Sequence, residues 1–405
     1  MILLFTCTLK KGEVMEEKKK NIVKGIEDIS NEILAVADWL KDNPETAYQE
    51  FKACEHLSGI LTGHGFDVQT GPGDVQTAFF GNPSGSEPRR PTVALLAEYD
   101  ALPGIGHGCG HNIIAAASIG AAIALKETVS ASSGSIVIVG TPAEEGGGGK
   151  VKLAEAGVFN DIDMALMFHP SDSNIPGKDS LGRIKFKMEF FGKTAHASGS
   201  PDQGRNALDA IVAAYVSMNS LRQHLRPDGR LHGIITHGGE APNIIPDYAA
   251  GLFYVRAGSI AYRDELFERV KKCAEGAALA TETKCKIEID HPVLDPILRN
   301  TPLETAVQKN MEALGITVDE DDGRKGSSDV GNLSRYLPAI QPYLAIVDAD
   351  SGIPGHSVGF REATVTPRGR ETTLNAAKML AMTAYDYLMS EDLRKGAKEE
   401  FDRRK

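Results

Sequence analysis

The chain has 405 residues and a formal net charge of -11, with 41% hydrophobic and 24% charged residues. Because single hydrophobic cores stop growing near about 250–300 residues, this length predicts two domains, and the near-average composition excludes a disordered chain or a fibrous repeat. The acidic balance argues against nucleic acid and anionic membranes as partners, since both require clustered Lys and Arg, and it favours a small-molecule substrate.

The cysteines and the apolar segments of the chain bear on its cellular location. Five scattered cysteines lack the spacing of a disulfide scaffold, which favours a reducing, cytoplasmic location. The apolar start from Met1 to Cys7 is too short for a signal-peptide core, so we expect a disordered or artefactual start, with Met15 as an alternative initiator. No later stretch has the apolar length of a membrane span.

The first part of the chain predicts helices followed by an alternation of strands and helices. Apolar residues at helical spacing indicate helices from Lys18 to Leu40 and from Phe51 to Leu61, with a break at Asn43-Pro44. Strands are predicted at 92–97, 135–140 and 163–168, and helices at 111–126 and 149–156. This order predicts an α/β domain with a mainly parallel sheet and helices on both faces.

The pattern of residues changes at Leu181, where apolar and charged residues begin to alternate as in a half-buried strand. The elements expected after it are a strand from 181, a helix at 206–224, strands at 231–236 and 251–256, a helix at 263–280 and a strand at 284–290. This β-α-β-β-α-β order predicts an inserted ferredoxin-like α+β domain that serves as a lid and dimerisation domain.

The first domain is then expected to resume. His291-Pro292 predicts a turn, and the elements that follow are a helix at 302–314, a strand at 343–347, a closing helix at 371–389 and a solvated charged tail at 391–405. The predicted boundaries are 15–181 and 293–405 for the catalytic domain and 182–292 for the inserted domain.

Residues able to bind a metal follow three predicted strands of the first domain. They are Glu98, Asp100, Cys109 and His111 after the first strand, Glu144 and Glu145 after the second, and His169 after the third. Ligands of open α/β sheets bind at the carboxyl ends of the strands, so these residues are expected at one edge.

Cys109 and His111 stand two residues apart in a glycine-rich turn, where a thiolate and an imidazole can converge on one divalent cation. The alternative is a helix start with a buried free cysteine, and His107 stays open between ligand, supporting residue and filler. Asp100 is placed to accept the free N–H of a ligating histidine. Its alternative is a simple turn before Pro103.

Glu144 and Glu145 are adjacent acids at a strand end, and their repulsion is relieved if a dinuclear metal site lies there. One glutamate would then bind a cation while its neighbour takes a proton from water. The alternative is a pair of solvated loop acids. A phosphate-binding loop is excluded, because Glu144 and Val151 occupy the positions where that motif needs Gly and Ser or Thr. His169 and His356 are isolated histidines, which by themselves are more often structural residues.

These residues, with several further motifs, are similar to those of a known family. The chain resembles the aminoacylase and carboxypeptidase G-like dinuclear metallohydrolases, and among them the auxin-conjugate hydrolases, aminobenzoyl-glutamate hydrolases and related dipeptidases. The likeness covers almost the whole chain and is carried by Asn43-Pro44-Glu45 with Gln49-Glu50, Asp100-Ala101-Leu102-Pro103, Cys109-Gly110-His111-Asn112, Pro142-Ala143-Glu144-Glu145-Gly146, His169-Pro170, Gly192-Lys193-Thr194-Ala195-His196-Ala197, Asn206-Ala207-Leu208-Asp209-Ala210, Asn243-Ile244-Ile245-Pro246-Asp247, Arg256-Ala257, Gly326-Ser327-Ser328-Asp329 and His356.

The resemblance implies two divalent ions, with zinc or manganese expected and cobalt as a further option. The implied ligands are Cys109, His111, Glu145, His169 and His356. Glu144 would be the general base, with Asp100 as a supporting acid. Two positions depart from the wider family: Glu98 stands where many members have a metal-binding histidine, and Cys109 where many have a bridging Asp.

In the inserted domain the resemblance assigns oxyanion stabilisation to His196 and substrate contacts to Asn243 and Arg256. A homodimer is expected, with His196 supplied across the interface. The alternatives are a turn residue for His196 and an exposed strand-end charge for Arg256. The predicted function is a metal-dependent amidohydrolase of N-acyl amino acids or dipeptides. The alternatives are a peptidase of longer peptides and a catalytically silent metal-binding or small-molecule-binding relative.

Overall fold

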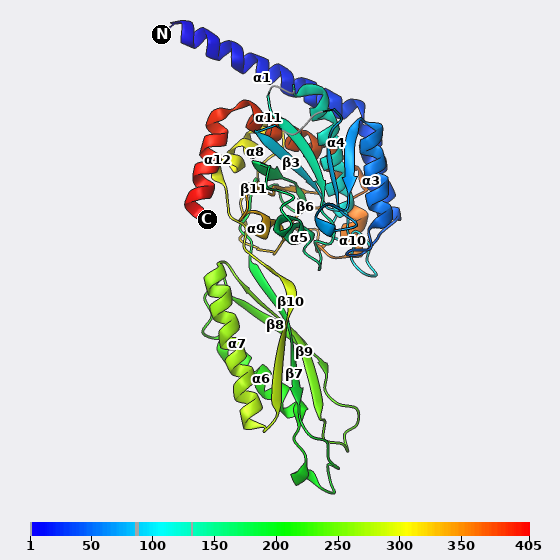
Figure 1. Cartoon of the computed structure of the whole chain (residues 1–405), viewed down its shortest axis with the longest axis vertical. Helices are drawn as coiled ribbons and strands as arrows, with labels where there is room; N and C mark the ends of the chain where they lie inside the picture. Colours follow the sequence, from blue (N-terminus) through cyan, green and yellow to red (C-terminus); the bar gives the residue numbers. More distant parts are fainter. Residues whose placement is uncertain (1, 86–88, 131–132) are drawn as a thin grey trace. The chain divides into compact units, whose positions relative to one another are not determined.

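A computed structural model describes residues 2–85, 89–130 and 133–405 (Figure 1). The chain forms two compact units. The first comprises Met1–Lys178, Leu298–Arg324 and Asn332–Lys405, and the second comprises Asp179–Ile297 with Lys325–Gly331. Each unit is considered by itself below.

The first unit is built on a six-stranded sheet with the strand order β1-β2-β4-β3-β5-β11. Its strands are β1 (Phe66–Thr70), β2 (Phe79–Pro83), β3 (Thr92–Ala97), β4 (Ser135–Gly140), β5 (Met164–Leu166) and β11 (Ala339–Ile340). The strands β4, β3, β5 and β11 run parallel, whereas β1 and β2 form an antiparallel pair. Every residue of β3 is buried, as the continuous apolar run of a central parallel strand predicts. A second, two-stranded sheet pairs β6 (His169–Ser171) with β12 (Tyr343–Ala345).

Helices pack around this sheet. They are α1 (Ile2–Asp28), α2 (Ser30–Asp42), α3 (Phe51–Gly63), α4 (His111–Thr128), α5 (Gly149–Glu155), α8 (Thr301–Ala313), α10 (Val358–Ala363), α11 (Pro367–Met389) and α12 (Glu391–Arg404), and the short helix α9 spans Val330–Leu333. The Ala-rich α4 is buried from His111 to Leu125, because it contacts β3, α2 and α11. This packing places the amino end of α4 beside the carboxyl end of β3.

The second unit is the predicted ferredoxin-like fold. Its elements are β7 (Gly182–Phe191), α6 (Ala207–Arg222), β8 (Arg230–His237), β9 (Tyr248–Ala257), α7 (Ile260–Ala280) and β10 (Lys284–Leu294). The antiparallel sheet has the order β10-β7-β9-β8, so β8 is an edge strand. Phe186, Met188 and Phe190 of β7 form a core of their own with apolar residues of α6 and α7.

Three expectations about the chain are wrong. The charged tail forms α12, and it buries Ala397 and Phe401, so it is part of the packed unit. Met1 lies outside the described residues, but the expected disordered start is wrong for Ile2–Cys7, because α1 begins at Ile2. His291-Pro292 is no turn, since β10 continues through it to Leu294, with an irregular register after Asp290. Within the described residues, no helix has the length and apolarity needed to cross a membrane.

Gly120 provides a test of how α2 and α4 pack. A Cβ atom at this position would lie 2.4 Å from Cδ1 of the buried Ile33. We predict that Gly120→Ala lowers the free energy of unfolding by about 1–3 kcal/mol, the usual cost of overpacking a core. The matched control is Gly59→Ala in α3, where no atom lies within 4 Å, and a change of up to about 1 kcal/mol toward greater stability is expected there. Urea unfolding followed by far-UV circular dichroism measures both, and equal stability of the two variants would contradict this packing.

Candidate metal centre

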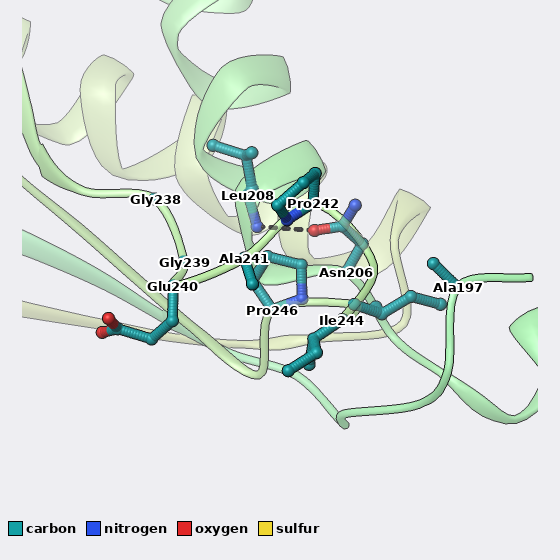
Figure 2. A pocket seen from close by; sticks show the side chains of 11 residues that line it. Ala197, Asn206, Leu208, Gly238, Gly239, Glu240, Ala241, Pro242, Ile244 and Pro246 are labelled. Atoms are coloured by element: carbon teal, nitrogen blue, oxygen red, sulfur yellow. Dashed lines mark hydrogen bonds between the residues drawn. The ribbon is translucent and has the colours of Figure 1, made fainter.

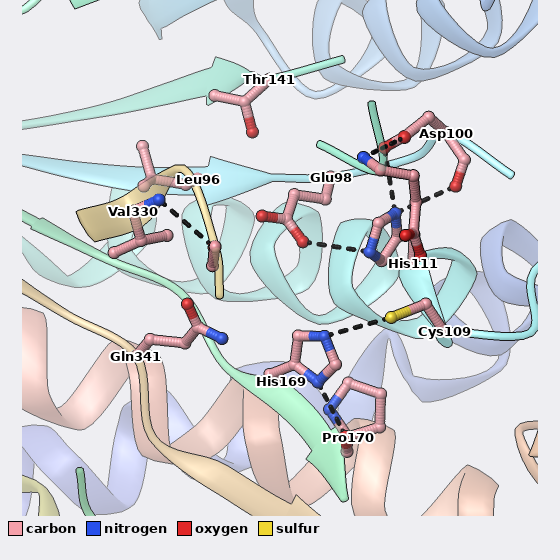
Figure 3. A network of polar contacts seen from close by, with 12 residues as sticks. Leu96, Glu98, Asp100, Cys109, His111, Thr141, His169, Pro170, Val330 and Gln341 are labelled. Carbon is pink, nitrogen blue, oxygen red and sulfur yellow. Dashed lines mark hydrogen bonds and ion pairs between the residues drawn. The ribbon is translucent and has the colours of Figure 1, made fainter. Parts of the chain in front are cut away.

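The predicted metal ligands come from four separate regions of the first unit. Cys109 and His111 stand at the amino end of α4, Glu145 follows β4, His169 begins β6 and His356 precedes α10. They meet because the parallel strands deliver their following loops to one edge of the sheet. Figure 3 shows Glu98, Asp100, His111, Cys109 and His169 around this point.

Three groups of side chains offer ligand atoms that lie within 4.8 Å of one another. They are Cys109 with His111 and His169, Cys109 with Glu145 and His356, and His111 with Glu144 and Glu145. The sulfur of Cys109 lies 3.4 Å from Nε2 of His169 and 3.4 Å from Nε2 of His356. The groups overlap, because Cys109, His111 and Glu145 each belong to two of them.

Two of the imidazole rings have one nitrogen engaged by the protein. Nδ1 of His111 lies 3.0 Å from both the carbonyl oxygen and Oδ1 of Asp100, and Nδ1 of His169 lies 2.8 Å from the carbonyl oxygen of Pro170. Because a carbonyl oxygen only accepts, each Nδ1 carries the proton and each Nε2 keeps a lone pair for a metal. Buried Nε2 of His111 and Oε1 of Glu145 have no hydrogen-bond partner among the described residues. A cation bound between these groups would satisfy both atoms, so the residues present fit a metal.

The electrostatics of the protein groups also suit a cation. Burial raises the pKa of the Cys109 thiol well above its usual range, and the nearby Glu145 adds to this. Burial lowers the pKa of His169 to about 4, which keeps the ring neutral. Burial opposes the charge of His111 as well, but Asp100 and Glu98 raise the pKa of His111 well above its ordinary value. A divalent ion would supply the positive charge that a thiolate and several carboxylates need at this edge.

Glu98 and Lys150 form a buried ion pair that the sequence patterns did not reveal. Oε1 of Glu98 accepts from Nζ of Lys150 at 2.5 Å, and both side chains are almost fully buried. Oε2 of Glu98 lies 3.4 Å from Nε2 of His111. The carboxylate that stands in place of the family's histidine therefore lies beside a proposed ligand, and a lysine of α5 balances its charge. The only sequence signal was that Lys150 directly follows four consecutive glycines at 146–149.

His107 is in none of the three ligand groups. Its ring is buried, and burial lowers its pKa to about 3, so it is a neutral ring. Of the roles left open for this residue, the geometry favours those outside the set of ligands.

The remaining predicted residues lie in the second unit. His196 is exposed, and its Nδ1 accepts hydrogen bonds from the backbone N–H groups of Ser198 and Gly199 at 3.3 and 3.1 Å. A neutral His196 ring therefore carries its proton on Nε2. The carbonyl oxygen of Asn243 accepts from the backbone N–H of Ala197, so His196 and Asn243 lie on paired segments. Beside them is a pocket of about 420 Å³, drawn in Figure 2 and lined by Ala197, Asn206, Leu208, Gly238, Gly239, Glu240, Ala241, Pro242, Ile244, Ile245 and Pro246.

Arg256 lies on β9, directly opposite Arg183 of β7. Its Nη1 donates to Oγ of Ser327 at 2.8 Å, and both guanidinium groups lie against the ring of Tyr254. Burial lowers the pKa of Arg256, and the neighbouring Arg183 adds to this. Within the described parts of the chain, no carboxylate forms an ion pair with either arginine. The sequence singled out Arg256 but missed Arg183, which appeared only as one of the alternating charges of a strand.

Known proteins resemble this chain in sequence. The model of Peptidase family M20/M25/M40 matches residues 94–372. The Xaa-Arg dipeptidase of Mus musculus is 35% identical over 405 residues, which cover 96% of this chain and 93% of that protein. One of the two p-aminobenzoyl-glutamate hydrolase subunits of Escherichia coli K12 is 35% identical over 322 residues, covering 74% of this chain and 66% of that protein.

Solved structures share the fold. A putative aminohydrolase from methicillin resistant Staphylococcus aureus has a TM-score of 0.75 and 21% identity, over 91% of this chain and 100% of that one. A dinuclear metal binding peptidase of the M20 family from Bacillus subtilis has a TM-score of 0.68 and 20% identity, over 89% of this chain and 99% of that one. The clustered ligand atoms are consistent with these sequence matches. The chain belongs to peptidase family M20/M25/M40, and the relatives named above are hydrolases of amide bonds.

Proposed function

We propose that this chain hydrolyses the amide bond of an N-acyl amino acid or a dipeptide with the help of two divalent ions, zinc or manganese, or else cobalt. The observation that carries the proposal is the overlap of three ligand groups in Cys109, His111 and Glu145. The ligands we propose are Cys109, His111, Glu145, His169 and His356. Bound divalent ions would lower the pKa of a water molecule and polarise the amide carbonyl.

Glu144 is the general base in this proposal. It directly precedes Glu145 in the turn after β4, and its carboxylate lies within 4.8 Å of the ligand atoms of His111 and Glu145. From that position it can take the proton of the attacking water and pass it to the leaving nitrogen. Asp100 supports the site, because its two carboxylate oxygens accept from Nδ1 of His111 and from the backbone N–H of Glu145.

The second unit supplies substrate contacts. Nε2–H of His196 is the donor that meets the negative charge developing on the carbonyl oxygen of the substrate. Arg256, with Asn243, binds the carboxylate of the substrate, and the lack of an acidic partner for Arg256 and Arg183 in the described residues supports an anionic ligand there. The relatives named Xaa-Arg dipeptidase and p-aminobenzoyl-glutamate hydrolase favour short substrates over long peptides.

The second unit is also the proposed lid and dimerisation domain, for which the sequence suggested residues 182–292. Its edge strand β8 exposes 63% of Ile234, and the adjacent helix α6 exposes 58% of Val216 and 44% of Val212. An apolar edge strand is a surface on which a second copy can pair. A homodimer through β8 and α6 would cover these residues. A cytoplasmic location stays a prediction from the cysteine content.

Chelation tests the metal requirement. Dialysis against a strong chelator should abolish amide hydrolysis but leave the far-UV circular dichroism largely intact, because the ligands lie at one edge of a sheet that has its own apolar core. Added zinc, manganese or cobalt should restore turnover of a panel of dipeptides, N-acyl amino acids and longer peptides. Full activity in protein shown by elemental analysis to be free of metal would refute the proposal. Turnover confined to the longer peptides would favour the alternative peptidase.

Substitution separates the roles of the two adjacent glutamates. Glu144→Gln keeps the size of the side chain but removes the base, so we expect turnover to fall by about 10²–10⁴-fold with the metal content nearly unchanged. Glu145→Gln should instead lower the metal occupancy, because a carboxylate ligand is lost. Steady-state kinetics and elemental analysis measure the two effects, and the opposite pattern would show that the roles are exchanged.

Mixed dimers test whether His196 acts across the interface. His196→Ala and Glu144→Gln should each be nearly inactive alone, because one lacks the oxyanion donor and the other the base. Subunit exchange in an equal mixture should restore about a quarter of the wild-type activity, since half of the dimers are mixed and each contains one complete site. Ile234→Glu introduced into both variants is the control, and it should give monomers by light scattering and no recovery. Recovery without dimers, or dimers without recovery, would contradict the model of a shared site.

A further inference from the structure

The segment from Glu45 to Glu50, just before α3, contacts both turns that carry the proposed site residues. The backbone N–H of Ala101 donates to the carbonyl oxygen of Glu45 at 2.8 Å, next to Asp100. On the other side, Oε1 of Glu50 accepts from the backbone N–H of Ala143 at 2.9 Å, next to Glu144. The proposed function assigns no role to this segment.

The turn that carries Glu144 and Glu145 has an unusual backbone. Ala143 has a φ of +59°, a left-handed conformation that is costly for a residue with a Cβ atom. Such a conformation persists only where the surroundings impose it. The N–H of Ala143 is held by Glu50, and the N–H of Glu145 is held by Oδ2 of Asp100 at 3.0 Å. Two buried carboxylates therefore bind the backbone on either side of Glu144.

Tyr48 holds the far end of the same turn. Its hydroxyl donates to the carbonyl oxygen of Gly147 at 2.6 Å, and Nζ of Lys152 lies 3.9 Å from the centre of its ring. A Cβ atom at Gly147 would lie 2.3 Å from the Tyr48 ring, so the turn passes directly over that ring. Tyr48 itself has a φ of +60°.

The side chain of Glu50 is directed to this turn and not to its own helix. Glu50 is the N-cap residue of α3, yet its side chain makes no capping hydrogen bond. Oε2 of Glu45 accepts from the N–H of Ala53 instead and supports the helix start. Glu50 is 0% exposed, and burial raises its pKa to about 7. A carboxyl group that costs this much to bury needs a compensating contact, and Ala143 provides the contact.

We propose that Glu50 is a positioning residue, which together with Tyr48 holds the strained turn at Ala143 so that Glu144 and Glu145 reach the same metal site. The inference rests on the proposed function for the roles of these two glutamates. A group that orients residues of a metal site acts on metal affinity and turnover together, whereas it leaves substrate contacts unchanged.

The test compares Glu50→Ala and Glu50→Gln in the full chain. Removal of the acceptor in Glu50→Ala should weaken zinc binding and lower kcat by about 10–100-fold each, with KM nearly unchanged. Glu50→Gln keeps a carbonyl oxygen that can accept from Ala143, so both quantities should return to within a few-fold of wild type. Zinc affinity is measured by competition with a chromophoric chelator, and kcat and KM with saturating metal.

The matched control is Cys54→Ala, one helical turn further along α3. Cys54 is 4% exposed and its sulfur contacts the carbonyl oxygen of Ala78, away from the turn. This variant should lose thermal stability without losing zinc affinity. If Glu50→Ala is too unstable to study, Tyr48→Phe removes only the hydroxyl that donates to Gly147 and should shift zinc affinity and kcat in the same direction, by less.

The outcomes separate the two proposals. Wild-type zinc affinity and kcat in Glu50→Ala, or in Tyr48→Phe if Glu50→Ala does not fold, would overturn the positioning role. An equal loss of zinc affinity in Cys54→Ala would overturn it as well, because the effect would then follow stability alone. A wild-type protein that binds no divalent metal and cleaves no amide would overturn the proposed function itself.

Discussion

The buried carboxylate of Asp100 is the contact on which the arrangement of the site depends. One oxygen lies 3.0 Å from Nδ1 of His111, and the other accepts from the backbone N–H of Glu145 at 3.0 Å. Burial would raise the pKa of Asp100, but His111 and the backbone N–H groups of Glu145 and Glu144 hold it below its usual value. A single charged group therefore connects the amino end of α4 with the loop after β4, and it sets the direction of an imidazole and of a carboxylate at once.

The carboxyl groups that surround Asp100 explain why the site needs positive charge. Glu50, Glu98, Asp100, Glu144 and Glu145 gather at one edge of the sheet, and a cluster of carboxyl groups in a dry interior is unstable unless cations or protons balance it. Lys150 balances Glu98, and burial leaves Glu50 with a raised pKa. His111 lies beside Asp100, so the charges that remain are those of Glu144 and Glu145, the proposed base and a proposed metal ligand. Acidic clustering of this kind costs folding stability and is explained best by a ligand.

The second unit provides a separate framework for the residues proposed to meet the substrate. Its core lies between one face of the sheet and the helices α6 and α7, so it stands independently of the sheet in the first unit. The loops with His196 and Asn243 are held by pairing with each other, and Arg256 extends from a strand. A stable scaffold of this type allows exposed polar loops to carry the contacts that distinguish one substrate from another.

Local patterns in the sequence determined much of the architecture. The strands β3 and β4 begin and end where their apolar runs do, and the β-α-β-β-α-β order of the second unit follows from alternation and helical spacing. These features are local, because the burial of each segment depends on its own pattern. The family likeness and the strand-end rule also predicted that Cys109, His111, Glu144, Glu145 and His169 would gather, since parallel strands present their carboxyl ends together.

Tertiary structure alone decided which side chains face each other across long distances in the chain. Glu98 pairs with Lys150, and the carboxylate of Glu50 accepts from the N–H of Ala143. For His356, only the family likeness predicted its place beside Cys109, 247 positions away in the chain. The helix α12 formed from a charged tail because Ala397 and Phe401 found a surface to pack on, which the composition of the tail does not reveal. The physical reason is common to these cases: the partner of a buried polar or apolar group is set by the direction in which two distant backbones pass each other.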